Sequence, residues 1–343
     1  MTTTYEPNVI LSTSTYDVIG TRPLRHDGAD KLTGVAKYGE DFSTAGMLHG
    51  KWLRSPHAHA LIKSLDVSKA AALDGVRAVV TGDDLPKSHP DESWEGTIGT
   101  FKLKRLRDLN LATDKVLFKG HPIAAVAAVN AHIAEEATKL IEVEYEILPS
   151  VMTAPDAMKS EAPILHEDLR TEEAGEEIGG PTNINKHIRY SNGDVEKGFD
   201  EADVVIEREF YTATVHQGYI EPHSCTVFWN KDNRVQIWGS TQAPFDVRDM
   251  TAGILGISAS QVKYSPLEIG GGFGGKWETY GESVAALLSK KAGRPVKMVM
   301  TRAEELEATG PTPGSYVRVK LGATADGKIV AGQAYVAFEA GAY

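Results

Sequence analysis

The alternation of hydrophobic and polar residues predicts two stretches that each mix strands with helices. In the first stretch, Val76–Thr81 is a predicted strand that ends at the turn residues Gly82-Asp83-Asp84. Pro122–Val129 is almost entirely apolar, which is typical of a strand buried on both faces. Asn130 then caps a predicted helix with apolar residues at helical spacing, and a strand over Glu142–Leu148 follows.

The second stretch opens with β-structure and then alternates. Pro244 begins a predicted helix that ends at Gly256, and Gly293 ends another that follows a cluster of glycines. The predicted strands are Val204–Tyr211, Thr226–Trp229, Val235–Trp238, Gln261–Ile269, Pro295–Thr301, Val317–Leu321 and Lys328–Phe338. Together the elements predict an α+β protein with mixed sheets.

Local composition predicts the domain organisation. Residues 1–19 are polar and rich in Thr and Ser, so we expect a flexible arm. Residues 20–150 form a first predicted domain. Residues 151–182 have few apolar positions and many Glu, Pro and Gly, which favours a linker. Residues 183–343 form the second predicted domain.

Composition excludes several classes of protein. With 343 residues, 41% hydrophobic and 24% charged, the chain can bury substantial cores. A net charge of −11 argues against nucleic acid or an anionic membrane as partner. Cys225 is the single cysteine, so an internal disulfide is impossible and an iron–sulfur cluster would need another chain. Without an export signal or a long apolar run, we expect a cytoplasmic protein with no membrane span.

The most informative stretch is Gly270-Gly271-Gly272-Phe273-Gly274-Gly275-Lys276, in which five of the first six residues are glycine. It permits a tight turn without a ligand. A phosphate-binding P-loop needs Ser or Thr after the lysine, and Trp277 stands there. A Gly-x-Gly-x-x-Gly turn over Gly270–Gly275, with an arginine near Arg302, would suit an NADP-binding dehydrogenase.

A family resemblance is more specific, because several segments match in order. Residues 270–276 resemble the glycine-rich segment of the xanthine dehydrogenase and aldehyde oxidase family, in which backbone amides approach a molybdenum–pterin centre. Residues 239–244 resemble the family segment whose glutamine binds a molybdenum oxo ligand, and residues 216–221 resemble a further motif. Residues 25–41 and 54–60 resemble the family's hammerhead domain. The resemblance covers about residues 18–343.

The resemblance implies an α/β hammerhead domain followed by an incomplete mixed α/β molybdopterin-binding domain. It also implies that the cofactor is bound by Gln242, Gly271, Gly272, Phe273 and Gly274, with Gln242 and Phe273 beside the metal's ligands rather than on the metal. Such subunits hydroxylate a C–H bond of an aldehyde or N-heteroaromatic substrate with oxygen from water. The molybdopterin is expected in a dinucleotide form, with 2Fe-2S and FAD on partner subunits.

Departures from the family pattern narrow these expectations. A glutamate that assists purine substrates is replaced by Trp277, and Thr312 matches the position of a substrate-binding arginine. Family subunits continue for about as long again, and the general-base glutamate belongs to that further part, so we expect no catalytic residue in this chain. Either a partner chain carries that further part, or this chain is a non-catalytic assembly module of the same fold.

Other residues receive plainer interpretations. His57 and His59 are two apart on an expected strand and so could face a metal together, but packing and hydrogen bonding are favoured because no third ligand is near in sequence. Cys225 is expected to be a buried apolar residue. Glu221 is expected to stabilise a turn.

Overall fold

The computed structural model describes residues 14–341, apart from residues 88, 90, 91 and 98. The chain divides into two compact units, Met1–Lys37 and Tyr38–Tyr343. In the described part of the first unit, helix α1 (Gly28–Thr33) ends at Gly34, whose φ of 74° is a conformation that glycine adopts without strain. Most of the arm predicted at residues 1–19 lies outside the described residues.

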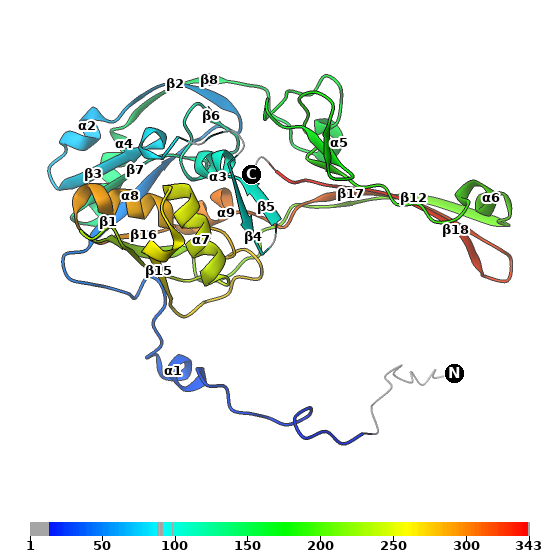
Figure 1. Cartoon of the computed structure of the whole chain (residues 1–343), viewed down its shortest axis with the longest axis horizontal. Helices are drawn as coiled ribbons and strands as arrows, with labels where there is room; N and C mark the ends of the chain where they lie inside the picture. The colour runs from blue at the N-terminus through cyan, green and yellow to red at the C-terminus, as the bar shows by residue number, and fades with distance from the viewer. Residues whose placement is uncertain (1–13, 88, 90–91, 98, 342–343) are drawn as a thin grey trace, which may run out of the picture. The chain divides into compact units, whose positions relative to one another are not determined.

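A seven-stranded mixed sheet, in the order β15-β14-β13-β16-β1-β7-β3, is the centre of the second unit (Figure 1). Its strands are β1 (Leu48–Arg54), β3 (Val76–Thr81), β7 (Pro122–Ala128), β13 (Ser224–Trp229), β14 (Val235–Gly239), β15 (Val262–Pro266) and β16 (Val296–Val299). β1 and β16 pair in parallel, with Leu48 opposite Val296. One sheet therefore unites strands from both sides of the segment predicted as a linker, and the domain boundaries themselves stay a prediction.

Helices cover both faces of this sheet. All seven residues of β7 are buried, as its apolar run predicts. Because successive side chains of a strand point to opposite faces, Ala125 and Ala127 join the core that contains helix α8 (Glu282–Ala292). Ala124 and Val126 join a second core, with helix α4 (Ala131–Lys139).

The predicted helix ends are confirmed by their capping geometry. The Asn130 side chain accepts a hydrogen bond from the N–H of Ile133 at the start of α4. Helix α7 (Pro244–Leu255) begins at a proline and ends at Gly256, and α8 ends at Gly293, with both glycines in the left-handed conformation. No helix in the described ranges is long and apolar enough to span a lipid bilayer.

The remaining elements form smaller units around the main sheet. Three sheets have the orders β6-β2-β8, β10-β9-β11 and β4-β5. Their strands are β2 (Ala60–Asp66), β4 (Ser93–Gly96), β5 (Gly99–Lys102), β6 (Lys115–Val116), β8 (Glu142–Ile147), β9 (Thr171–Glu173), β10 (Glu176–Ile178) and β11 (Lys186–His187). The short helices are α2 (Ser68–Ala72), α3 (Leu103–Asn110), α5 (Ala154–Ala157), α6 (Val195–Asp200), α9 (Arg302–Ala308), η1 (Gly82–Asp84) and η2 (Ala259–Gln261).

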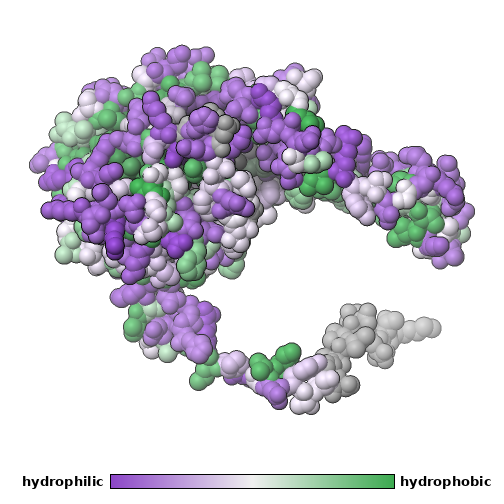
Figure 2. Space-filling model, viewed as in Figure 1, coloured by the Kyte–Doolittle hydropathy of each residue, from purple (hydrophilic) through white to green (hydrophobic). Residues whose placement is uncertain are grey.

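A separate three-stranded sheet has one apolar face that the described residues leave largely open. It contains β12 (Val204–Thr212), β17 (Ser315–Ala323) and β18 (Ile329–Phe338). Cross-strand pairing places five apolar residues, each at least 45% exposed, on the same face of this sheet. They are Ile206, Phe210, Leu321, Val336 and Phe338. On the other face, Phe199 of α6 contacts Lys320 of β17. Figure 2 shows hydrophobic atoms at the surface near the end of this sheet.

Candidate cofactor-binding site

Two loops meet at the ends of neighbouring strands. β14 and β15 pair in parallel, so their carboxyl ends lie at the same edge of the main sheet. The segment after β14 carries Gln242, and the segment after β15 continues into residues 270–276, here called the glycine loop. Gln242 Oε1 accepts hydrogen bonds from the N–H of Gly274 at 2.9 Å and of Lys276 at 3.4 Å. The two segments that the sequence singled out are therefore in direct contact.

The glycine loop needs glycine for two separate reasons. A Cβ atom on Gly272 would lie 2.6 Å from Gln242 Oε1, so a side chain there would displace the glutamine. Gly271 and Gly274 have φ angles of 95° and 91°, which non-glycine residues rarely adopt. Phe273 has a φ of 50° between them, and its side chain is 73% exposed. The tip of the loop, Phe273 and Gly274, is therefore at the surface and presents an aromatic ring there.

The N–H groups at the centre of the glycine loop have no hydrogen-bond partner in the part of the chain that the structure describes. Among the described residues, the amides of Gly271, Gly272 and Phe273 have no hydrogen-bond acceptor, although Gly272 is buried. Two main-chain N–H donors bind the oxygen of the Gln242 carboxamide, which fixes its orientation and leaves Nε2 as a further donor. This set of donors fits an electron-rich group with several oxygen atoms.

A buried ion pair lies behind the glycine loop. Lys276 Nζ is 2.7 Å from Glu221 Oε2, and the lysine side chain is completely buried. Burial lowers the pKa of Lys276, and the hydrogen bond from its ammonium to Glu221 limits that fall. Glu221 was expected to stabilise a turn, and its carboxylate does bind the glycine loop, through the N–H of Gly270 and the ammonium of Lys276. The clue in the sequence was Lys276, since a buried lysine needs an acidic partner.

A second buried acid, Glu305 of α9, lies beside the segment that carries Glu221. Its carboxylate accepts hydrogen bonds from Tyr219 Oη at 2.5 Å and from Nδ1 and the main-chain N–H of His223 at 2.8 and 2.6 Å. Burial alone would raise the pKa of Glu305, but these donors outweigh it and hold the pKa at about 2. Tyr219 also supports the glycine loop, since a Cβ on Gly275 would lie 2.8 Å from its ring.

The dinucleotide interpretation of the glycine loop is not supported by the local fold. That interpretation requires the glycines to open directly into a helix, so that the helix N-terminus faces the phosphates. Helix α8 begins only at Glu282, several residues after Lys276. Gly281, which precedes it, packs against Trp52 and Cys225 in the core.

The two histidines considered as metal ligands lie in a loop rather than on a strand. β1 ends at Arg54 and β2 begins at Ala60, and the Ser55 hydroxyl accepts the N–H of His57 in a turn between them. His57 packs edge-on against Tyr145, and His59 Nδ1 bonds the Pro149 carbonyl at 2.6 Å. No cluster of three potential His, Cys, Asp or Glu ligands occurs within the described ranges.

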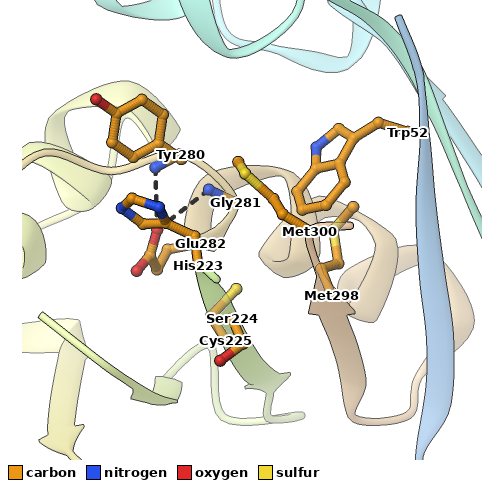
Figure 3. Close-up of a pocket in the computed structure, with 9 residues that line it drawn as sticks. All are labelled: Trp52, His223, Ser224, Cys225, Tyr280, Gly281, Glu282, Met298 and Met300. Carbon is orange, nitrogen blue, oxygen red and sulfur yellow. Dashed lines mark hydrogen bonds between the residues drawn. The ribbon is translucent and has the colours of Figure 1, made fainter. Parts of the chain in front are cut away.

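A small pocket lies in the core of the main sheet, and Figure 3 shows the side chains that surround it. Its lining includes Cys225, His223 and Trp52 but neither Gln242 nor any residue of the glycine loop. Cys225 is buried, as expected, and burial raises the pKa of its thiol well above the usual value. A protonated thiol is a poor nucleophile, so we assign it a packing role.

Two family models match the chain. The model of the aldehyde oxidase and xanthine dehydrogenase a/b hammerhead domain matches residues 33–149, and that of the molybdopterin cofactor-binding domain matches residues 177–343. Gln242 and the glycine loop both lie in the second range.

Two curated relatives are similar in sequence to nearly the whole of this chain. The nicotinate dehydrogenase large molybdopterin subunit of Eubacterium barkeri is 33% identical over 96% of this chain and 72% of its own length. The carbon monoxide dehydrogenase large chain of Afipia carboxidovorans is 34% identical over 99% of this chain and 42% of its own length.

A solved structure of CO dehydrogenase from Oligotropha carboxidovorans matches the fold with a TM-score of 0.77 and 32% identity. The match covers 92% of this chain and 39% of that one. The chain therefore spans about two fifths of the length of several relatives that it matches, and a larger share of the nicotinate dehydrogenase subunit.

Proposed function

Because the chain belongs to the xanthine dehydrogenase and aldehyde oxidase family of molybdenum-cofactor-binding subunits, we propose that it holds the pterin-bound molybdenum of a hydroxylase. The supporting observation is the contact between Gln242 and the glycine loop, which leaves one side-chain donor and three main-chain donors free. These donors lie at the carboxyl edge of two parallel strands, where sheets of this kind bind ligands.

Each residue has a defined part in this proposal. Gln242 Nε2 would donate a hydrogen bond to an oxygen atom of the bound cofactor, while its Oε1 stays fixed by the loop. The N–H groups of Gly271, Gly272 and Phe273 donate to the oxygen-rich cofactor in the same way, and the exposed Phe273 ring forms an apolar wall. When bound, the cofactor supplies the redox centre that takes electrons from a C–H bond as oxygen from water is added.

The substrate class that we propose is an aldehyde or an N-heteroaromatic ring other than a purine. The indole N–H of Trp277 donates to Asp246 Oδ2 at 2.8 Å, so this side chain is held as a hydrogen-bond donor. An indole accepts no proton, and Trp277 therefore cannot replace a carboxylate that assists a purine.

The proposed assembly contains further polypeptide. We propose an iron–sulfur subunit and a flavin subunit as electron partners in the cytoplasm, with molybdopterin in a dinucleotide form. The general-base glutamate and further pterin contacts belong to sequence that corresponds to the rest of the relatives' length. The apolar face of β12, β17 and β18 is the surface on which we propose that this sequence docks.

The proposal is tested by the metal content of the purified chain. The chain is produced alone and together with the products of the genes next to its own, and molybdenum and pterin are measured. We expect both to be retained, and Gln242→Ala to reduce them about tenfold or more, because it removes a donor beside the metal's ligands.

Gln236→Ala is the matched control. Gln236 lies on β14, the strand that leads to Gln242, but its amide binds Ile237 and Ser265 and not the glycine loop. Its molybdenum content is expected to equal that of the wild type. A wild-type chain free of molybdenum and pterin in both preparations would contradict the proposal and favour a non-catalytic assembly module.

A further inference from the structure

Lys276 ends a loop whose tip, Phe273 and Gly274, is exposed, yet its own side chain is turned entirely inward. The exposed fraction of the side chain is 0%, whereas Phe273 in the same loop is 73% exposed. Its ammonium donates to Glu221 Oε2 at 2.7 Å and to Ser240 Oγ at 3.1 Å, and lies 5.0 Å from the centre of the Tyr219 ring. A lysine pays a large desolvation cost in such a position, so its partners must be specific.

The Glu221 carboxylate binds both ends of the glycine loop. Oε2 accepts the main-chain N–H of Gly270 at 2.7 Å as well as the ammonium of Lys276. The same oxygen accepts Ser240 Oγ at 2.8 Å, from the segment that carries Gln242. Oε1 accepts the N–H of Gly39 at 3.2 Å. One side chain therefore connects four segments that are far apart in the sequence.

This arrangement fixes the loop without using its central amides. The ends are held by Glu221, and the N–H of Gly274 is held by Gln242. The amides of Gly271, Gly272 and Phe273 donate no hydrogen bond within the described residues. A buried ion pair contributes little net stability compared with apolar packing, so its presence is better explained by the conformation that it specifies.

We infer that the Glu221–Lys276 pair is a positioning device that holds the glycine loop with its three central amides free to donate. The inference rests on the proposed function only for what the free amides bind, namely the molybdenum cofactor. The conformation of the loop is inferred without it. Neither residue is assigned a catalytic role, since each acts through the loop.

The first test uses Lys276→Met in the full chain without cofactor, with Arg54→Met as matched control. Arg54 forms a partly buried ion pair, with Glu304 at 2.9 Å, and bonds none of the four segments. Hydrogen–deuterium exchange measures how well the amides of the glycine loop are protected, and thermal unfolding measures global stability. We expect exchange of the hydrogen-bonded loop amides, those of Gly270, Gly274, Gly275 and Lys276, to rise about tenfold or more in Lys276→Met only. Both variants are expected to lower the melting temperature.

The second test separates loop conformation from stability. The double variant Glu221→Gln/Lys276→Met removes the uncompensated charge, so its melting temperature is expected to recover towards that of the wild type. Its loop exchange should remain high, because the ammonium that links Lys276 to Glu221 and Ser240 is absent. Across these variants, the amount of molybdenum retained after co-expression should follow the protection of the loop amides and not the melting temperature.

Unchanged loop exchange in Lys276→Met, or an equal rise in Arg54→Met, would overturn the inference. So would a double variant in which loop protection returns together with stability. A wild-type chain whose loop protection depends on Lys276 but which never binds molybdenum would support the inference and contradict the proposed function.

Discussion

His121 is a completely buried imidazole whose two nitrogens have fixed roles. Nδ1 accepts the N–H of Leu117 at 3.1 Å, so the proton is on Nε2, which bonds the Asp108 carbonyl at 2.7 Å. Burial lowers the pKa of His121 to about 4. Protonation at Nδ1 would break the bond to Leu117 and place a charge in the core.

Stability is therefore expected to fall as the pH is lowered from 7 to 4.5. The unfolded chain takes up a proton near pH 6.5, whereas folded His121 does so only near pH 4, so acid favours unfolding across this interval. The expected contribution is about 2.5 kcal/mol at pH 4.5. Urea unfolding of the wild type and His121→Gln checks it, and curves of equal pH dependence would contradict the assignment.

Residues of the site differ in how far sequence could identify them. Gln242 and Phe273 could be singled out because each belongs to a short segment with a recognisable pattern, and the structure brings these segments into contact. Their role in binding the cofactor stays a prediction. The ion pair of Glu221 with Lys276 and the role of Glu305 were missed, because the partners lie 55 and 82 residues away in sequence. The expected strand over His57 and His59 was wrong because a local serine hydrogen bond makes a turn there.

At the scale of elements, local signals were sufficient where capping or burial dominates. Asn130 begins its helix, and Gly256 and Gly293 end theirs, as predicted, because backbone geometry at a cap depends on few residues. The strand predicted at Gln261–Ile269 is shorter, since β15 ends at Pro266. Exposure could not be predicted, and β12 is exposed along its whole length despite its apolar residues.

The open apolar face of β12, β17 and β18 is expected to cause self-association of the isolated chain. Phe210 is 55% exposed on this face, paired with Val317. Phe210→Lys should reduce the average mass in sedimentation at high protein concentration. Tyr211→Lys, on the next residue and the opposite face, is the matched control because Tyr211 is 70% exposed. Equal effects of both substitutions would argue against an interface on one face.

At the scale of the whole molecule, the main sheet is shared by both family-matched regions. Neither hydropathy nor capping predicted this, because the pairing of β1 with β16 is parallel and joins residues that are distant in sequence. Met298 of β16 is completely buried between β1 and β13, opposite Gly50 and Cys225. Loss of packing at Met298 would therefore destabilise strands from both regions.

Residues 38–343 are therefore expected to unfold in one cooperative transition. Met298→Ala should lower the free energy of unfolding by about 2–5 kcal/mol, as for other buried methionines. Calorimetry should record one transition at a lower temperature, with faster hydrogen exchange in both β7 and β14. Two separate transitions, only one of them shifted, would show that the regions fold independently.

The parallel pairing of β1 with β16 also affects how the protein is made. Leu48 leaves the ribosome 248 residues before its partner Val296. At translation rates of 5–20 residues per second, β1 waits roughly 12 to 50 s with one edge unpaired. The nascent chain thus carries an open strand edge during this interval, and its yield should depend on chaperones that shield such edges until β16 emerges.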